Sequence, residues 1–281
     1  MLRKGLTWLA LVLIPTLLVA QAVPYDPADA PAQPDPVPGE LIEVPEGANL
    51  LLNPSFETNG GVGSSTFSDW TVFDVPGSVG GVPSTFGSIV VQTGTMVTVS
   101  GNMVEAPTDG TFAAMADATG PSAKLIYQDF AVPEGTTSLS CDVYINEQSG
   151  TFIVAGTLDW ESVPNQHARL DLADPAASPD DVGAGVLENL FITNPGDPSV
   201  QSYQTIAADI SAYAGQTVRL RFAEVDNQFF FNAGIDNCSV TNTPPPPDDA
   251  TIDVPTLGTG GIVALVLLLA AAGFVVFRRR A

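Results

Sequence analysis

Residues 217–241, TVRLRFAEVDNQFFFNAGIDNCSVT, decide the fold class of this chain. From Val218 to Phe222 apolar side chains alternate with arginines, which is the period-two pattern of a strand with one buried face. The chain then turns through residues 224–228 and returns in a second apolar run, residues 229–240. The stretch predicts the last two strands of a β-sandwich.

Working outward, the rest of the interior contains short apolar runs separated by Gly- and Pro-containing turns, without a long helical periodicity. The clearest run is residues 138–146, where every second residue is apolar. Further strand-like runs are residues 49–52, 69–75, 88–99, 111–116, 125–131, 150–160, 167–172 and 203–206. Residues 174–202 are long for a loop, and form either a functional excursion or a short helix around residues 182–190. The pattern predicts an all-β jelly-roll β-sandwich.

Charge is distributed very unevenly along the 281 residues, which carry a formal net charge of −22. All 31 acidic residues lie between Asp26 and Asp253, and the basic residues in that interval are Lys124, Arg169, Arg219 and Arg221. Such a surface repels nucleic acid and anionic lipid headgroups, so neither is an expected partner. It suits divalent cations, neutral sugars or a salty medium, although acids also simply keep an exported protein soluble.

The N-terminus has the features of a secretory signal peptide. Residues 1–22 combine Arg3 and Lys4, an apolar run and a small-x-small cleavage site at residues 20–22. An uncleaved anchor helix is the alternative, although the run is short for a membrane span. Residues 23–47 are rich in Pro, Ala and Asp and are expected to be a linker.

The C-terminus has three parts in a fixed order. After a second Pro-rich linker, residues 242–253, come a short motif, an apolar span and an arginine cluster: Val254, Pro255, Thr256 and Leu257; residues 258–277; and Arg278, Arg279 and Arg280. The span is long enough for a transmembrane helix, and the arginines are expected to stay cytoplasmic.

This order resembles the IPTL-CTERM class of bacterial sorting tails, relatives of the PEP-CTERM tails handled by exosortase-type transpeptidases. The Trp that often follows the motif in that class is replaced by Gly258. The resemblance implies that residues 254–281 are a sorting tail and that an exosortase-type enzyme is a partner. The protein would be exported, first anchored in the inner membrane, then placed in the envelope, on the cell surface or outside the cell. A plain single-span anchor is the alternative.

The two ends of the interior carry a second resemblance. Residues 49–57, NLLLNPSFE, followed by Trp70, and the closing residues 214–222 and 234–240 look like the galactose-binding-like jelly rolls of carbohydrate-binding modules. The resemblance implies that residues 48–241 are one such domain, with polysaccharide or extracellular matrix as its partner. The same fold also serves protein and lipid recognition or acts as a spacer.

In that family the first and last strands meet, and a structural calcium ion often lies where they do. The resemblance therefore implies Ca²⁺ as a structural cofactor, with Glu57 and Asp236 as the matching ligands and Asn53 as a helper. The alternative is that Glu57 is solvated and Asp236 caps a turn.

Cys141 and Cys238 are the two cysteines of the chain, each within an expected strand and on its inward face. In an oxidising envelope they are expected to form a disulfide. Two separate core thiols are the alternative.

The aromatic residues Trp160 and Tyr203 are candidates for a platform on which a sugar ring stacks, although aromatic residues more often belong to the core. His167 is the only histidine, and no nucleophile, P-loop or zinc motif is present. The acid pairs at residues 180–181 and 224/226 carry little information among so many carboxylates.

Together these features predict an exported, surface-displayed, non-enzymatic β-sandwich that binds carbohydrate or extracellular matrix. A structural or adhesive envelope protein without a small ligand is the first alternative, and a glycan-active hydrolase is the second.

Overall fold

The computed structural model describes residues 48–243. The expected signal peptide, N-terminal linker and sorting tail, and most of the second linker, lie outside the described residues. Within residues 48–243 no helix is long and apolar enough to cross a membrane.

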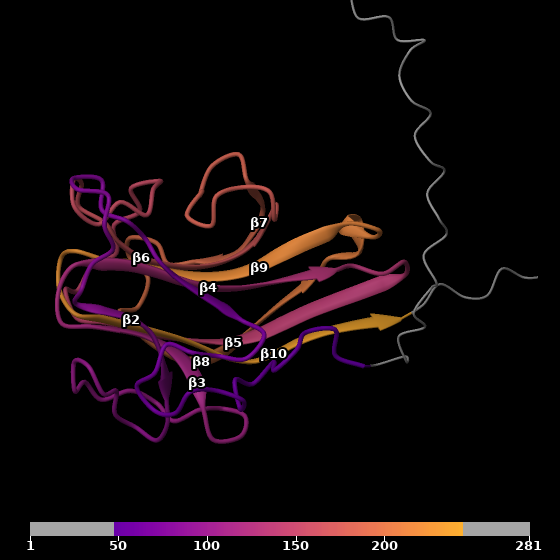
Figure 1. Cartoon of the computed structure of the whole chain (residues 1–281), viewed down its shortest axis with the longest axis horizontal. Coiled ribbons are helices and arrows are strands. Elements are labelled where there is room, and N and C mark those ends of the chain that lie inside the picture. The colour runs from indigo at the N-terminus through magenta and orange to yellow at the C-terminus, as the bar shows by residue number, and fades with distance from the viewer. Residues whose placement is uncertain (1–47, 244–281) are drawn as a thin grey trace, which may run out of the picture. The chain divides into compact units, whose positions relative to one another are not determined.

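Ten strands form two five-stranded antiparallel sheets, stacked face to face (Figure 1). Sheet 1 has the order β1-β4-β9-β6-β7, with β1 (Thr71–Asp74), β4 (Ser122–Ala131), β9 (Thr217–Asp226), β6 (Gln166–Ala173) and β7 (Val186–Ile192). Sheet 2 has the order β2-β3-β10-β5-β8, with β2 (Gly87–Gln92), β3 (Ala113–Ala118), β10 (Phe231–Thr243), β5 (Thr136–Glu147) and β8 (Val200–Asp209). A 3₁₀ helix, η2 (Ser211–Tyr213), joins β8 to β9.

The strand order is that of a jelly roll, as the sequence predicts. From β3 to β10 every connection crosses between the sheets except the one from β6 to β7. The two closing strands, β9 and β10, are each central in a different sheet, so residues 217–241 contribute a central strand to both layers.

The core lies between the sheets and follows the period-two pattern. On β9, Val218, Leu220 and Phe222 are fully buried in it, and the inward side chains of β5 from Leu139 to Ile145 pack against them from sheet 2. Each such side chain contributes about 1.5–3 kcal/mol through burial.

Long loops cover the outer faces of both sheets. Leu158 and Trp160, from the β5–β6 loop, pack on the outer face of sheet 1 around Leu125. Val97 and Val104, from the β2–β3 loop, pack on sheet 2. The loops lie outside the two sheets (Figure 1), and their side chains add two small cores to the main one.

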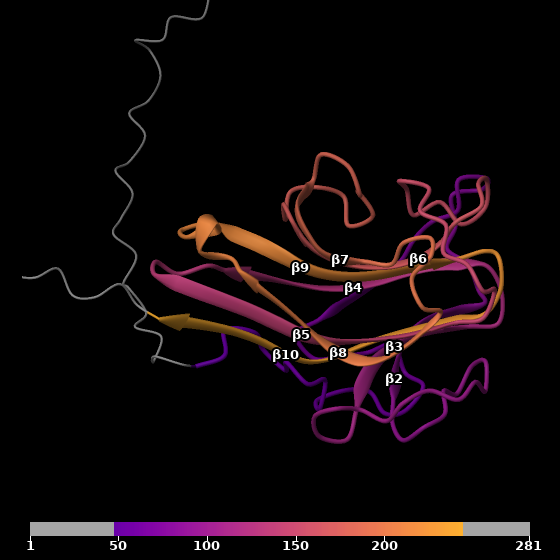
Figure 2. The ribbon, with the colours of Figure 1, turned by 180° about the vertical axis from the view of Figure 1, so that it is seen from behind.

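The first described residues run beside the last strand. Leu50 N donates to Val240 O at 2.8 Å, and Cys238 N donates to Pro54 O at 3.0 Å. Residues 48 and 243 therefore lie at one end of the sandwich, whereas the β3–β4 and β9–β10 connections lie at the other, as both views show (Figures 1 and 2). We call the latter the loop end.

Three regions differ from the sequence-based expectation. Residues 49–52 form no strand, although Leu50 N donates to Val240 O of the last strand. Residues 150–160 form no strand and have a single isolated bridge, from Ile153 to Gln166. Residues 174–202 contain β7 rather than a helix around 182–190, because this segment pairs with β6. The apolar residues of this segment are compatible with either a helix or a strand. Pairing with β6 makes it a strand.

Candidate binding site at the loop end

Two adjoining hollows form a cleft at the loop end. The first has a volume of about 260 Å³ and is lined by Thr119, Gly120, Pro121, Asp226, Asn227, Gln228, Phe229 and Phe230. The second, of about 310 Å³, is lined by Pro121, Trp160, Glu161, Ser162, Val163, Pro164, Asn227 and Gln228. Pro121, Asn227 and Gln228 are shared, so the two hollows lie side by side.

Asn227 holds the ridge between the hollows in place. Its Nδ2 donates to Trp160 O at 3.1 Å and to Val163 O at 2.6 Å, and its Oδ1 accepts from Asn165 N at 2.8 Å. The amide therefore joins the β9–β10 turn to the β5–β6 loop. Both of its polar atoms are used, which makes Asn227 a positioning residue.

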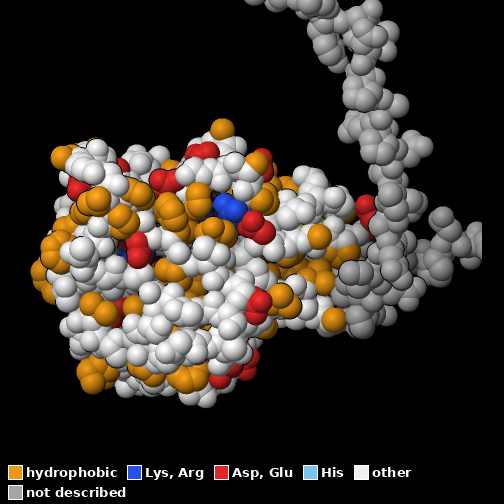
Figure 3. Space-filling model, in the orientation of Figure 1, with side chains coloured by type: hydrophobic (Ala, Val, Ile, Leu, Met, Phe, Trp, Pro, Cys, Tyr) orange, Lys and Arg blue, Asp and Glu red, His pale blue; other side chains and the backbone are white. Residues whose placement is uncertain are grey.

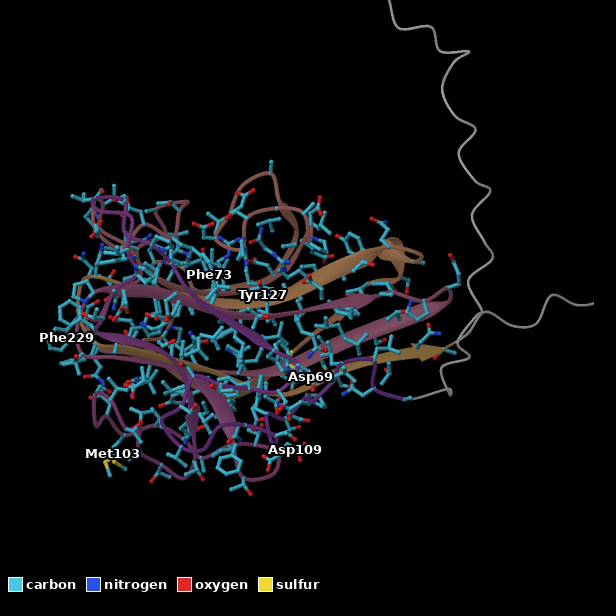
Figure 4. All side chains as sticks on the ribbon, viewed as in Figure 1. Asp69, Phe73, Met103, Asp109, Tyr127 and Phe229 are labelled. Atoms are coloured by element: carbon cyan, nitrogen blue, oxygen red, sulfur yellow. A yellow bond between two sulfur atoms is a disulfide. The ribbon has the colours of Figure 1, made fainter. Side chains whose placement is uncertain are left out.

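Aromatic rings border the cleft. Phe229 is 55% exposed and meets Phe230 edge to face, with ring centroids 5.2 Å apart. Trp160 is half-buried and its Nε1 donates to Val75 O at 3.0 Å, which fixes the indole at the second hollow. Figure 4 shows Phe229 at the extreme of the loop end, and Figure 3 shows hydrophobic side chains gathered there. Such rings suit the apolar face of a sugar.

Asp226 forms the polar floor of the first hollow. Its Oδ1 accepts from Ser122 N at 3.1 Å, Ser122 Oγ at 2.8 Å and Lys124 Nζ at 3.3 Å. No hydrogen bond within residues 48–243 reaches its Oδ2, and Asp226 itself is 3% exposed. One carboxylate oxygen is therefore fixed by the protein and the other is left to the cleft.

Behind Asp226 lies a buried ion pair. Lys124 Nζ is 2.7 Å from Glu224 Oε2, and both side chains are completely buried. Burial, and then the charge of Asp226, raises the pKa of Glu224 well above its usual range. Burial opposes the charge of Lys124, but the negative charges of Asp226 and Glu224 outweigh it and raise the lysine pKa. The cluster thus shares one lysine between two carboxyl groups, those of Glu224 and Asp226.

The structure does not bring the two predicted platform residues together. Trp160 packs on the outer face of sheet 1, whereas Tyr203, on β8, packs on the outer face of sheet 2 under the β2–β3 loop. The Tyr203 ring lies 5.3 Å from that of Tyr144, and its hydroxyl is buried without a partner among the described residues. Trp160 borders the cleft and Tyr203 does not.

The predicted calcium ligands lie near one another but are engaged with backbone donors. Glu57 Oε1 accepts from Thr111 N and Phe112 N, both at 2.8 Å. Asp236 Oδ2 accepts from Thr108 N at 2.7 Å and Asp109 N at 3.0 Å. Asp236 and the Glu57 carboxylate thus fix the loop before β3.

Asn53 also serves its own turn, because its Oδ1 accepts from Thr58 N at 2.9 Å. N–H groups that point at these oxygens present positive charge where a cation would need to bind, so the donor set fits Ca²⁺ poorly. Within residues 48–243 no group of three or more His, Cys, Asp or Glu side chains is arranged to hold a metal. Calcium binding stays a prediction.

The disulfide is present between Cys141 and Cys238. It joins β5 to β10 at the bulge where the register shifts between Asp236 and Ser239, and both half-cystines face the main core. The sequence-based prediction of a bridge between a middle strand and the last one is confirmed.

Sequence reasoning missed Asp226, Gln228 and Phe229 as site residues. The available signal was the run of three phenylalanines from Phe229 to Phe231, because side chains alternate in a strand and consecutive rings cannot all face one core. Phe231 is buried in the core and Phe229 is exposed. The sequence predicts that the returning run begins at Phe229, whereas β10 begins at Phe231, which leaves the first two rings in the turn.

The fold and site define a two-sheet jelly-roll β-sandwich with a cleft at its loop end. No family model and no curated protein matches the chain. Among solved structures it is similar to TmCBM61 in complex with beta-1,4-galactotriose, at 12% identity and a TM-score of 0.40, over 70% of this chain and 99% of that one.

Two further solved structures are similar at the same level. The K3 cleaved adhesin domain of Lys-gingipain from Porphyromonas gingivalis matches at 12% identity and a TM-score of 0.40, over 70% and 98% of the two chains. A Stig cyclase from Fischerella sp. TAU matches at 16% identity and a TM-score of 0.42, over 72% of this chain and 100% of that one. Similarity of this degree assigns neither a family nor a ligand.

Proposed function

We propose that the chain is an exported, surface-displayed, non-enzymatic protein that binds carbohydrate in the cleft at the loop end. The observation that carries the proposal is the pairing of an exposed ring, Phe229, with a partly unsatisfied carboxylate, Asp226, around one hollow. Sugar recognition combines an apolar stacking surface with a few well-placed polar groups. The loop end also lies opposite the end from which residues 48 and 243 lead to the expected linkers.

Export and delivery are part of the same proposal. The signal peptide at residues 1–22 and the sorting motif from Val254 to Leu257 support an envelope or extracellular location, with an exosortase-type enzyme processing the tail. Mass spectrometry of the surface-exposed protein tests this. We expect its last peptide to lack Arg280, and a mature form that retains Arg280 would rule out processing.

Binding is tested with a panel of polysaccharides and the Phe229→Ala variant. We expect at least one polymer to bind the wild-type protein, and the variant to lose about tenfold in affinity, because a stacking ring of this kind is worth ~1.4 kcal/mol. Leu52→Ala is the matched control, since Leu52 is 61% exposed and lies outside the cleft. Release of reducing sugar during the assay would show a hydrolase instead.

A structural or adhesive role is the second candidate, favoured by exposed apolar side chains on the β1–β2 loop. Val79 is 72% exposed, Val82 65% and Phe86 48%. Such side chains suit contact with another protein. Absence of binding across the whole polysaccharide panel would favour this candidate.

A further inference from the structure

We infer that the cleft selects a neutral, hydroxyl-rich glycan over acidic ones, and that Asp226 is the residue that makes the selection. The inference rests on the carbohydrate-binding function proposed above and specifies its ligand. Three observations carry it. Side-chain atoms of the first hollow lack partners, Lys124 contacts Asp226 and Glu224 beneath the hollow, and every basic side chain in the described part of the chain is paired with a carboxylate.

The side-chain atoms left free in the first hollow are hydrogen-bond acceptors. Asp226 Oδ2 has no partner in residues 48–243. Gln228 donates through Nε2 to Asn227 O at 3.2 Å and to Asn227 Oδ1 at 2.6 Å, and its Oε1 accepts no hydrogen bond within residues 48–243. Thr119 Oγ1 donates to Phe86 O. A ligand that satisfies these side-chain atoms must therefore donate, which is what sugar hydroxyl groups do.

Asp226 is held as an acceptor by the groups behind it. Ser122 and Lys124 donate to its Oδ1, so Oδ2 is the oxygen of this lining residue that stays without a partner in residues 48–243. Lys124 Nζ lies 3.3 Å from Asp226 Oδ1 and 2.7 Å from Glu224 Oε2, so the ammonium group faces both carboxyl groups beneath the hollow. The floor of the cleft is thus a carboxyl group held in place by Ser122 and Lys124.

No basic side chain in residues 48–243 is left to receive an anionic sugar. Lys124 contacts Glu224 and Asp226; Arg169 and Arg221 each contact Asp171; and Arg219 contacts Asp129. The second hollow adds another carboxylate, Glu161. A uronate or sulfate group would therefore meet negative charge without compensation.

The Asp226→Asn variant tests the selection and is expected to fold. Lys124 keeps Glu224 as a partner, 2.7 Å away, so the substitution does not leave the buried ammonium group without a carboxyl group. Ser122 N and Lys124 would hold the new amide oxygen on their side, which turns Nδ2 toward the cleft. The substitution therefore converts the free acceptor into a donor.

The experiment compares neutral hexose polymers with the same polymers after oxidation of the C6 hydroxymethyl group to a carboxylate. Affinities are measured for the full-length chain in mild detergent. For wild type we expect at least about tenfold tighter binding of a neutral polymer than of its oxidised form. Asp226→Asn should lose about tenfold or more on the neutral polymer, and its preference should shrink.

Two further variants complete the design. Asp209→Asn, an exposed acid at the opposite end, should leave affinity and preference unchanged. Gln228→Glu keeps an acceptor in the cleft and adds a charge at an exposed position, so it should sharpen the preference even if Asp226→Asn fails to fold. If wild type binds no polymer, the proposed function itself fails. If it binds a neutral polymer but Asp226→Asn, once shown to be folded, and Gln228→Glu both keep the wild-type preference, only the selection by Asp226 is overturned.

Discussion

At the scale of single residues, the described chain places its few basic side chains inside rather than on the surface. Lys124 and Arg221 are completely buried, and Arg169 and Arg219 are nearly so. Each contacts a carboxylate, and both Lys124 and Asp171 have two partners of opposite charge. The exposed surface therefore keeps its acidic character, and Figure 3 shows blue atoms in only small areas of the visible face.

The buried His167 should make stability depend on acid pH. Burial, and then the nearby charge of Arg169, lowers its pKa to about 4, and its Nε2 has no partner in residues 48–243. Between the unfolded value of about 6.5 and this lower value the native state binds fewer protons than the unfolded one. Stability is therefore lost as pH falls through this window, by about 3 kcal/mol at most.

The His167→Gln variant isolates this effect. The melting temperature should fall between pH 7 and pH 4.5 in both proteins, and the fall should be smaller for the variant than for wild type. The comparison between variants is needed because burial raises the pKa of Asp236 to about 6, which acts in the opposite direction over the same pH range. An equal fall in both proteins would show that the imidazole is not the group responsible.

The calcium prediction is also decided by individual residues. If Glu57 and Asp236 bind the ion, calcium at 100 times its Kd should stabilise chelator-treated protein by about 2.7 kcal/mol, because the ion binds only the native state. The melting temperature would rise by about 5–10 °C. Glu57→Gln should abolish the rise. Identical melting curves with and without calcium would contradict the prediction and leave these carboxylates as the hydrogen-bond acceptors seen here.

At the scale of elements, an arginine on β9 holds the loop before β7. Arg221 Nη1 donates to Pro179 O at 2.7 Å and Asp181 O at 2.6 Å, while Nη2 contacts Asp171 at 2.6 Å. A segment without regular structure is thus fixed through its carbonyl groups. The alternation that made β9 recognisable put this arginine on the outer face, where the loop covers it.

Arg221→Met should release the segment 174–185 without unfolding the sandwich. Asp171 keeps Arg169 as a partner, so the cost is the loss of the carbonyl contacts, about 2–4 kcal/mol. Hydrogen exchange of backbone amides in residues 174–185 should increase. Arg169→Met is the matched control, because Arg169 shares Asp171 but donates to Asn189 instead of these carbonyl groups. Equal exchange in the two variants would show that the loop does not depend on Arg221.

Alternation in the sequence was enough to predict β5, β6 and β9, because each of these strands buries one face in a core. It was not enough for β7, where half-buried residues give a weak pattern, nor for residues 150–160, which pack on a sheet without joining it. The cleft was missed for a related reason. Its residues come from three loops, and only the fold places Pro121, Trp160 and Phe229 at one end.

At the scale of the whole molecule, the jelly roll separates attachment from recognition. Residues 48 and 243 lie at one end and the cleft at the other (Figure 2). Because every connection from β3 to β6 and from β7 to β10 crosses between the sheets, the loops gather at the ends and can vary without changing the core. This arrangement suits a domain displayed on linkers.

The disulfide constrains the same architecture through the unfolded state. Cys141 and Cys238 are 97 residues apart, so the bond encloses the chain from β5 to β10. Closing a loop of that length removes unfolded-state entropy worth about 4.7 kcal/mol, with measured losses on removal of about 2–5 kcal/mol. The Cys141→Ala/Cys238→Ala double variant should lose about 2–5 kcal/mol of its free energy of unfolding.

Urea unfolding of residues 48–243 separates this effect from a packing defect. The double variant should show a lower midpoint and a larger m value, because its unfolded chain is less compact and exposes more surface. Val143→Ala, a cavity variant two residues along β5, should lower the midpoint with m unchanged, since it affects only the native core. If the double variant also kept its m value, the bridge would be stabilising the folded sheet rather than restricting the unfolded chain, and its contribution would belong to the β5–β10 pair alone.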